Sequence, residues 1–131
     1  MQDFRKLLVW RRAHDLVLKV RRATRRFPRT GYGSLKSQMV SAAESIVYNI
    51  VEVCGASSRK DFARFLDISI KSTSELEYRF ELAKDCGVLG GQEWRRLSAE
   101  VVEIRRMLCG LRRKLLEADR AVARTDSHAD D

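Results

Sequence analysis

Proline, cysteine, histidine and aromatic residues are all scarce in this chain of 131 residues. A single proline leaves little to interrupt helices. Three cysteines make an odd number without a CxxC pair, so we interpret Cys54, Cys86 and Cys109 as reduced thiols that need no disulfide. The first residues are charged and no run of about 18 apolar residues occurs, so neither a signal peptide nor a membrane span is predicted. We therefore expect a cytoplasmic protein without membrane contact.

The sequence also lacks the residue patterns of common catalytic and cofactor sites. Its two histidines, His14 and His128, do not follow the Glu-x-x-His pattern of di-iron bundles. There is no Walker loop, no GxSxG sequence, and no Cys, His and acid set with a reason to converge. We expect no enzymatic activity, no metal and no cofactor.

Four segments place apolar or small residues at alternating steps of three and four, which puts them on one helix face. The first helix is predicted to end near Arg26, before Pro28, and the second to run from an N-cap at Ser34 to Gly55. The third is predicted to start at a cap at Ser57 or Ser58 and to end at Gly87, and the fourth to follow Gly90 and Gly91. Short turns between such helices favour antiparallel neighbours. The sequence predicts an all-α fold, an up-down-up-down four-helix bundle over residues 1–120, and a disordered tail over residues 121–131.

The second segment carries more apolar surface than one bundle core needs. Besides its core stripe, it has a second strip formed by Val40, Val47, Val51 and Cys54. A helix that is apolar nearly all round is usually buried on two sides. We interpret Val40, Val47 and Val51, together with Leu18 of the first segment, as an interface between subunits. A wide core stripe in an asymmetric monomer is the alternative.

Asn49 falls on the core stripe of the same segment. An amide buried there must find a partner or destabilise the fold. We predict a structural hydrogen bond across the bundle to Ser69, Ser72 or Thr73, in preference to a ligand site.

The net charge of +8 lies in the first thirty residues, where ten bases face two acids. On a helical wheel, six of these bases lie opposite the core stripe: Arg11, Arg12, Lys19, Arg22, Arg25 and Arg26. Clustered bases gain binding free energy from nucleic acid, because they displace condensed counterions. This face predicts RNA or DNA binding without sequence specificity. The alternative is a solvated face, partly neutralised by Asp15 and by acids of neighbouring subunits.

Four blocks of sequence also resemble a known family. They are LLVWRRAHDL, SIVYNIVEVCG, SSRKDFARFLDIS and ELEYRFELAKDCGVL, which cover most of residues 4 to 89. In this order and spacing they are similar to the bacterial four-helix-bundle family encoded in intervening sequences of large-subunit ribosomal RNA genes. The resemblance implies a homo-oligomeric ring, a pentamer, and kinship in fold with accessory proteins of diversity-generating retroelements. Valines stand at positions 47 and 53, where the family commonly has proline and glycine, so we expect a straighter or longer second helix.

Together these observations predict a non-enzymatic, homo-oligomeric interaction module that binds nucleic acid through the basic face of its first helix. One alternative is a scaffold that docks a protein partner on Leu18 and the surrounding bases. The resemblance suggests a reverse transcriptase as such a partner. The other alternative is a passenger of a mobile element with no defined cellular activity.

Overall fold

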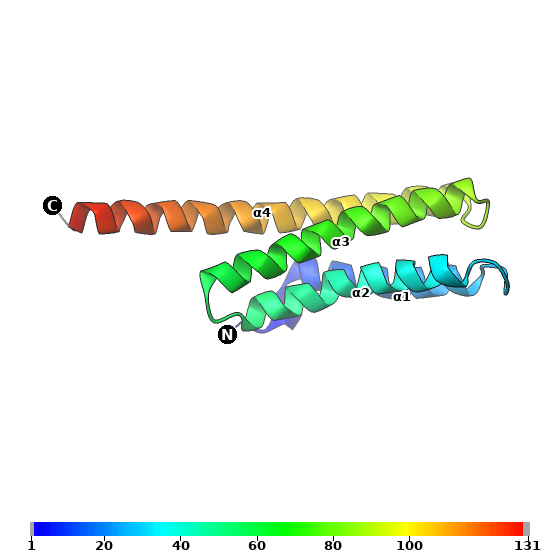
Figure 1. The fold of residues 1–131 in the computed structure, drawn as a ribbon, viewed down its shortest axis with the longest axis horizontal. Helices are drawn as coiled ribbons and strands as arrows, with labels where there is room; N and C mark the ends of the chain where they lie inside the picture. The colour runs from blue at the N-terminus through cyan, green and yellow to red at the C-terminus, as the bar shows by residue number, and fades with distance from the viewer. Residues whose placement is uncertain (1, 130–131) are drawn as a thin grey trace.

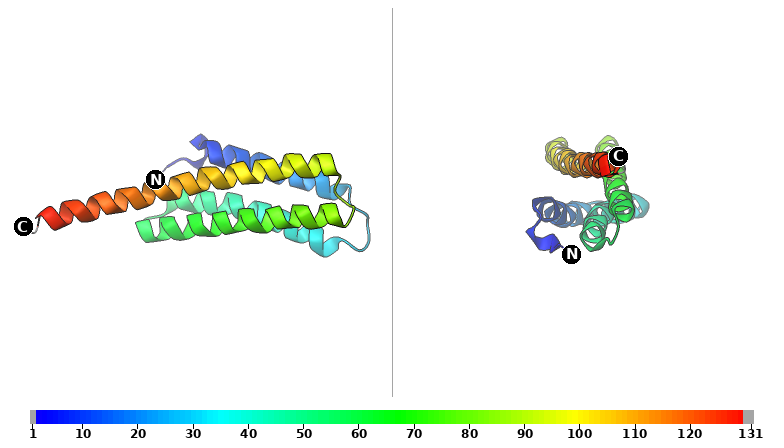
Figure 2. Two further views of the ribbon diagram at one scale, coloured as in Figure 1. Left: turned by 90° about the horizontal axis from the view of Figure 1, so that it is seen from above. Right: turned by 90° about the vertical axis from the view of Figure 1, so that its left-hand side faces the viewer.

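The computed structural model describes the backbone of residues 2–129 and the side chains of residues 2–125. A short 3₁₀ helix, η1 (Phe4–Lys6), precedes four α-helices: α1 (Leu8–Arg25), α2 (Gly33–Gly55), α3 (Arg59–Asp85) and α4 (Gly91–Ala129). The four helices run up, down, up and down (Figure 1). Each packs against two neighbours, in the pairs α1–α2, α2–α3, α3–α4 and α4–α1 (Figure 2). The structure confirms the predicted all-α, antiparallel four-helix bundle.

The ends of α3 follow the predicted signals. Ser58 is its N-cap, and its hydroxyl accepts a hydrogen bond from the backbone N–H of Asp61 at 3.2 Å. After the helix, Gly87 has a φ of +78°, while the N–H of Val88 bonds to the carbonyl of Ala83 at 3.0 Å. The predicted cap at Ser34 is wrong: α2 begins earlier, at Gly33, so Ser34 lies inside its first turn.

The core runs along the bundle axis, and its largest fully buried side chains include Leu16, Met39, Ile46, Phe80 and Leu108. The stripes predicted for α2, α3 and α4 face this core along most of their length. For the first helix, the spacing of three and four predicts a core stripe, and four of its members are buried as predicted: Ala13, Val20, Thr24 and Phe27. The buried face of α1 is turned slightly from the rest of that stripe, which is Trp10 and Val17. Leu16 is buried there, whereas Trp10 and Val17 are only half-buried. Trp10 lies at the edge, between Phe4 and His14, with ring centroids 5.0 Å from each.

The apolar strip of α2 that predicted a subunit interface lies largely inside the chain's own fold. Its members are Val40, Val47, Val51 and Cys54. Val47 and Cys54 are buried, and the other two are half-buried. At about 100° per residue, the strip is on the same side of α2 as Glu44, which forms an ion pair with Arg21 of α1. The strip therefore faces α1, and Val40 and Val51 remain partly exposed there; an interface between subunits on Val40, Val47 and Val51 stays a prediction.

The contact between α2 and α3, here called the α2–α3 seam, is made through small hydroxyl side chains. Ser45 and Ser72 share a hydrogen bond of 2.7 Å between their Oγ atoms, and Ser69 donates to the carbonyl of Ile46 at 3.0 Å. The predicted bond from Asn49 to α3 is wrong, because its amide donates to the carbonyl of Ser45, on its own helix, at 2.7 Å. The hydrogen bonds across the seam come from its serines.

The α4 helix has 39 residues and is the longest. Asp119 of α4 forms an ion pair with Arg59, the first residue of α3, so residues 120–129 lie past the start of α3 (Figure 1). We call this segment the α4 overhang. The prediction of disorder from residue 121 is wrong as far as Ala129, and residues 130 and 131 lie outside the described part. A helix already formed gains one hydrogen bond for each residue added, and the alanines and arginines of this segment favour its continuation.

Candidate nucleic-acid interface

Half of the predicted basic face of α1 points straight out from the bundle. At about 100° per residue, Arg11, Arg22 and Arg25 surround Leu18, on the side opposite the buried Val20. All three arginines are exposed, as is 43% of Leu18. Among the side chains of residues 2–125, none forms an ion pair with these arginines. We call Arg11, Leu18, Arg22 and Arg25 the outer ridge.

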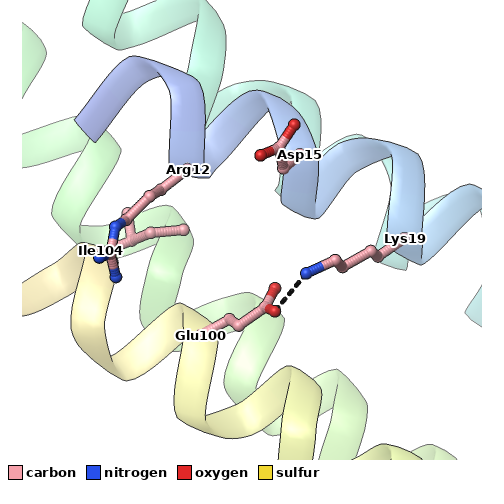
Figure 3. Close-up of a pocket in the computed structure, with 5 residues that line it drawn as sticks. All are labelled: Arg12, Asp15, Lys19, Glu100 and Ile104. Carbon is pink, nitrogen blue, oxygen red and sulfur yellow. Dashed lines mark hydrogen bonds and ion pairs between the residues drawn. The ribbon is translucent and has the colours of Figure 1, made fainter. Parts of the chain in front are cut away.

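The other predicted bases turn sideways, toward α4. Lys19 forms an ion pair with Glu100, and Arg26 forms one with Glu93 at 2.5 Å. Arg12 reaches toward Ile104 of α4 (Figure 3). The structure thus divides the predicted face into an outer ridge without acidic partners and a flank whose charges are partly neutralised.

The flank borders a groove. The contact between α1 and α4, the α1–α4 seam, is the least closely packed of the four. One hollow in it, of about 180 Å³, is lined by Arg12, Asp15, Lys19, Glu100 and Ile104 (Figure 3). A neighbouring hollow of about 280 Å³ shares Lys19 and Glu100 and adds Arg22, Arg26, Glu93, Arg96 and Leu97. We call the two together the α1–α4 groove; it lies beside the outer ridge and shares Arg22 with it.

A third carboxylate, Glu103, stands on the same edge of α4. It accepts two hydrogen bonds from the Arg106 guanidinium, at 2.7 and 2.9 Å. These bonds lower the pKa of Glu103, and the positive charges of Arg106 and Arg12 lower it further. Glu103 therefore stays ionised at neutral pH, as a negative charge close to Arg12.

Two carboxylates of α4, Glu93 and Glu100, line the candidate site and are not among the residues predicted for it. Neutralisation by Asp15 and by acids of other subunits was the alternative at the sequence level, whereas these acids come from the same chain. A signal was present: Lys19 and Arg26 are seven residues apart, and so are Glu93 and Glu100. In antiparallel helices with heptad stripes, such matched spacing brings the pairs into register, as in coiled coils.

Other chemistry is sparse within the described residues. No group of three or more His, Cys, Asp or Glu side chains is arranged to hold a metal ion there. None of the helices described is both long and apolar enough to cross a bilayer. Cys54 is buried, which raises the pKa of its thiol, and the nearby charge of Asp3 raises it further. Cys86 is exposed and Cys109 half-buried.

The fold and the site define a class of protein: an all-α helical bundle with a basic outer ridge and a charged groove along one seam. The chain belongs to the 23S rRNA-intervening sequence protein family, whose sequence model matches residues 5–110. This confirms the family indicated by the four sequence blocks.

One solved structure supports the fold independently. It is a crystal structure of a protein of unknown function from the S23 ribosomal protein family of Bacteroides thetaiotaomicron. The two chains are 21% identical and superpose with a TM-score of 0.72, over 81% of this chain and 96% of the other. At that identity the likeness shows the fold alone. No curated protein matches the chain.

Proposed function

We propose that this protein is a non-enzymatic, homo-oligomeric interaction module that binds the phosphates of RNA or DNA with the outer ridge of α1. The observation that carries the proposal is that Arg11, Arg22 and Arg25 are exposed on one side of α1, while other bases of that helix form ion pairs across the bundle. Guanidinium groups form strong, charge-assisted hydrogen bonds with phosphate.

The same surface argues against recognition of a base sequence. Trp10 is packed between Phe4 and His14, and Lys84 lies 3.7 Å from the ring centroid of Trp94. Both indoles are also half-buried against the core, so they are poorly placed to stack on a base. Phosphate contacts position a nucleic acid without reading its sequence, and repetition of the ridge in a homo-oligomer would add avidity.

The test is a salt titration of binding, with Arg11, Arg22 and Arg25 all changed to Gln. Fluorescence anisotropy would follow random duplex DNA, random RNA and a 23S ribosomal RNA fragment, because the family description names that RNA. Each lost phosphate contact flattens the slope of log K against log salt by about 0.9 on duplex DNA and about 0.7 on single strands. We expect the slope to flatten by the equivalent of two to three phosphate contacts, and by the same amount for all nucleic-acid sequences.

The matched control changes Lys60, Arg64 and Lys71 of α3 to Gln, which removes the same charge on a helix that does not contact α1. Its effect should be clearly smaller. Undetectable binding by the wild type near 50 mM salt, or equal effects of the two triple variants, would contradict the proposal. Light scattering on the wild type tests the assembly, for which the family resemblance predicts five subunits.

A second candidate function is docking of a protein partner, such as a reverse transcriptase. The observation that favours it is Leu18, a 43% exposed apolar side chain in the middle of the ridge. Phosphate binding makes no use of this side chain. Leu18→Ser should therefore leave the salt slope with nucleic acid unchanged and weaken only a protein complex. If Leu18→Ser lost nucleic-acid binding, the result would contradict this separation of roles, in which the arginines bind phosphate and Leu18 binds a protein.

A further inference from the structure

We propose that the α1–α4 groove is a phosphate-binding site in which Glu93 and Glu100 occupy the places of phosphates until a nucleic acid displaces them. This inference rests on the proposed function and adds a second set of contacts beside the outer ridge. In the protein alone, Lys19 and Arg26 are held by these carboxylates. When nucleic acid lies along α1, its phosphates would take over both bases.

The groove offers bases from both of its walls. Arg12, Lys19, Arg22 and Arg26 line it from α1, and Arg96 lines it from α4. These five bases outnumber the three carboxylates in its lining, Asp15, Glu93 and Glu100. Figure 3 shows Arg12 and Lys19 both extending from α1 toward α4, where Glu100 meets the Lys19 ammonium. An anion between the helices can thus be contacted from two sides, whereas the outer ridge contacts it from one.

The two ion pairs are of a kind that a phosphate can replace. Lys19 and Glu100 keep 43% and 35% of their side chains exposed, and Arg26 and Glu93 keep 67% and 34%. Pairs this open to water are screened and stabilise the fold only slightly. A phosphodiester presents the same kind of charged oxygen to the base, and its binding also releases condensed cations from the nucleic acid. Low salt should therefore favour the exchange.

The register of the pairs makes the site continuous. Glu93 and Glu100 are seven residues apart on α4, which is a rise of about 10 Å along the helix. Both hollows share Lys19 and Glu100, so release of the two carboxylates would leave one uninterrupted row of bases. This arrangement fits an extended chain of phosphates better than a single small anion.

The deciding variant is Glu93→Gln with Glu100→Gln, which keeps the side-chain shape and removes the internal competitors. With random duplex DNA as the probe, we expect tighter binding, by about tenfold or more near 0.1 M salt, because the phosphates no longer compete with two carboxylates for Lys19 and Arg26. The slope of log K against log salt should change little, since the same bases contact phosphate in both proteins. Changing Lys19 and Arg26 to Gln in the same protein should abolish this gain. Circular dichroism would check that each variant is folded.

The control is Asp67→Asn with Glu77→Gln. These carboxylates pair with Arg112 and Arg105 across the α3–α4 contact, at 2.6 and 2.8 Å. The control therefore changes the net charge by the same amount as the groove variant and also removes two ion pairs between helices. Equal gains in the two double variants would mean a general charge effect and would overturn the inference. An unchanged affinity in the groove variant would also overturn it.

The outcomes separate this inference from the proposed function. Wild-type binding that depends on Arg11, Arg22 and Arg25, with no gain in the groove variant, would retain the ridge and reject the groove. Binding by the groove variant alone, with none by the wild type, would support the groove and reject the outer ridge as a sufficient site. If neither protein bound, both proposals would fall.

Discussion

The α2–α3 seam and the α1–α4 seam join helices of the same bundle in opposite ways. The α2–α3 seam is the most closely packed contact, and its hydrogen bonds come from Ser45, Ser69 and Ser72. The α1–α4 seam is the least closely packed, and long charged side chains such as Lys19 and Glu100 bridge it beside two hollows. Small hydroxyl residues let helix backbones approach and satisfy buried polar atoms, whereas long ionic side chains reach across a wider gap.

This difference assigns different tasks to the two seams. Buried contacts and hydrogen bonds without water contribute to stability at any salt concentration, but they offer nothing to a ligand. Exposed ion pairs contribute little to stability, but their partners can be exchanged for other charged groups. We therefore expect the α2–α3 seam to carry fold stability and the α1–α4 seam to carry binding.

The largest effect should come from truncating a core leucine near each seam. Leu76→Ala in α3, where the side chain is fully buried, should lower the free energy of unfolding by about 2–5 kcal/mol. Leu97→Ala in α4 should cost less, toward the lower end of that range, because Leu97 borders the groove and its cavity can open to water. Urea denaturation followed by circular dichroism measures both, and a larger loss for Leu97→Ala would reverse the comparison.

A smaller effect should come from the polar contacts themselves. Ser69→Ala removes a buried hydrogen bond and should cost about 0.5–1.5 kcal/mol, with the same loss at low and high salt. Glu100→Gln removes an exposed ion pair and should cost about 0–1 kcal/mol, with the loss vanishing near 1 M salt. Thermal denaturation at the two salt concentrations separates them. If Ser69→Ala and Glu100→Gln lost stability with the same dependence on salt, the proposed difference between a salt-independent and a salt-dependent seam would be wrong.

The smallest effect should be a dependence on pH at Glu103, whose hydrogen-bond partner Arg106 lies one turn further along α4. The pKa of Glu103 is lowered in the folded protein, so its contribution to stability is complete above the ordinary carboxyl value of 4.5 and is lost as pH falls through the lowered pKa. Glu103→Gln should therefore flatten the loss of stability below about pH 4.5. Urea denaturation of the wild type and of Glu103→Gln at a series of pH values measures this, and an unchanged acid profile in Glu103→Gln would contradict it.

Most of the fold was predictable from periodicity and local signals. The stripes of α2, α3 and α4 and the cap at Ser58 depend on residues close in sequence, so the prediction was confirmed. The errors concern features that depend on contacts between helices. Leu16 is buried in α1 and Trp10 is not, because neighbouring helices fix the rotation of α1. Asn49 bonds to its own helix, and the three hydroxyls predicted as its partners have other ones: Ser72 pairs with Ser45, Ser69 with the Ile46 carbonyl and Thr73 with the Ile70 carbonyl.

The candidate site was predicted only in part, for a related reason. A helical wheel shows that the bases of α1 avoid the core, but it does not show which helix stands on either side. Arg11, Arg22 and Arg25 point outward as predicted, whereas Lys19 and Arg26 meet carboxylates of α4 about seventy to eighty residues later in the chain. Only a comparison of the charge spacing on the two helices would have revealed those pairs.

The α4 overhang gives the molecule a built-in spacer. Its ten residues, 120–129, extend the helix by about 15 Å past the ion pair between Asp119 and Arg59. A helix has a fixed rise and a fixed rotation per residue. A fluorophore or a fused domain joined to this segment would therefore be held at a defined distance and in a defined direction from the bundle. Changing the length of this segment by one residue would turn such an attachment by about 100°, whereas seven residues would move it outward by about 10 Å with almost no turn.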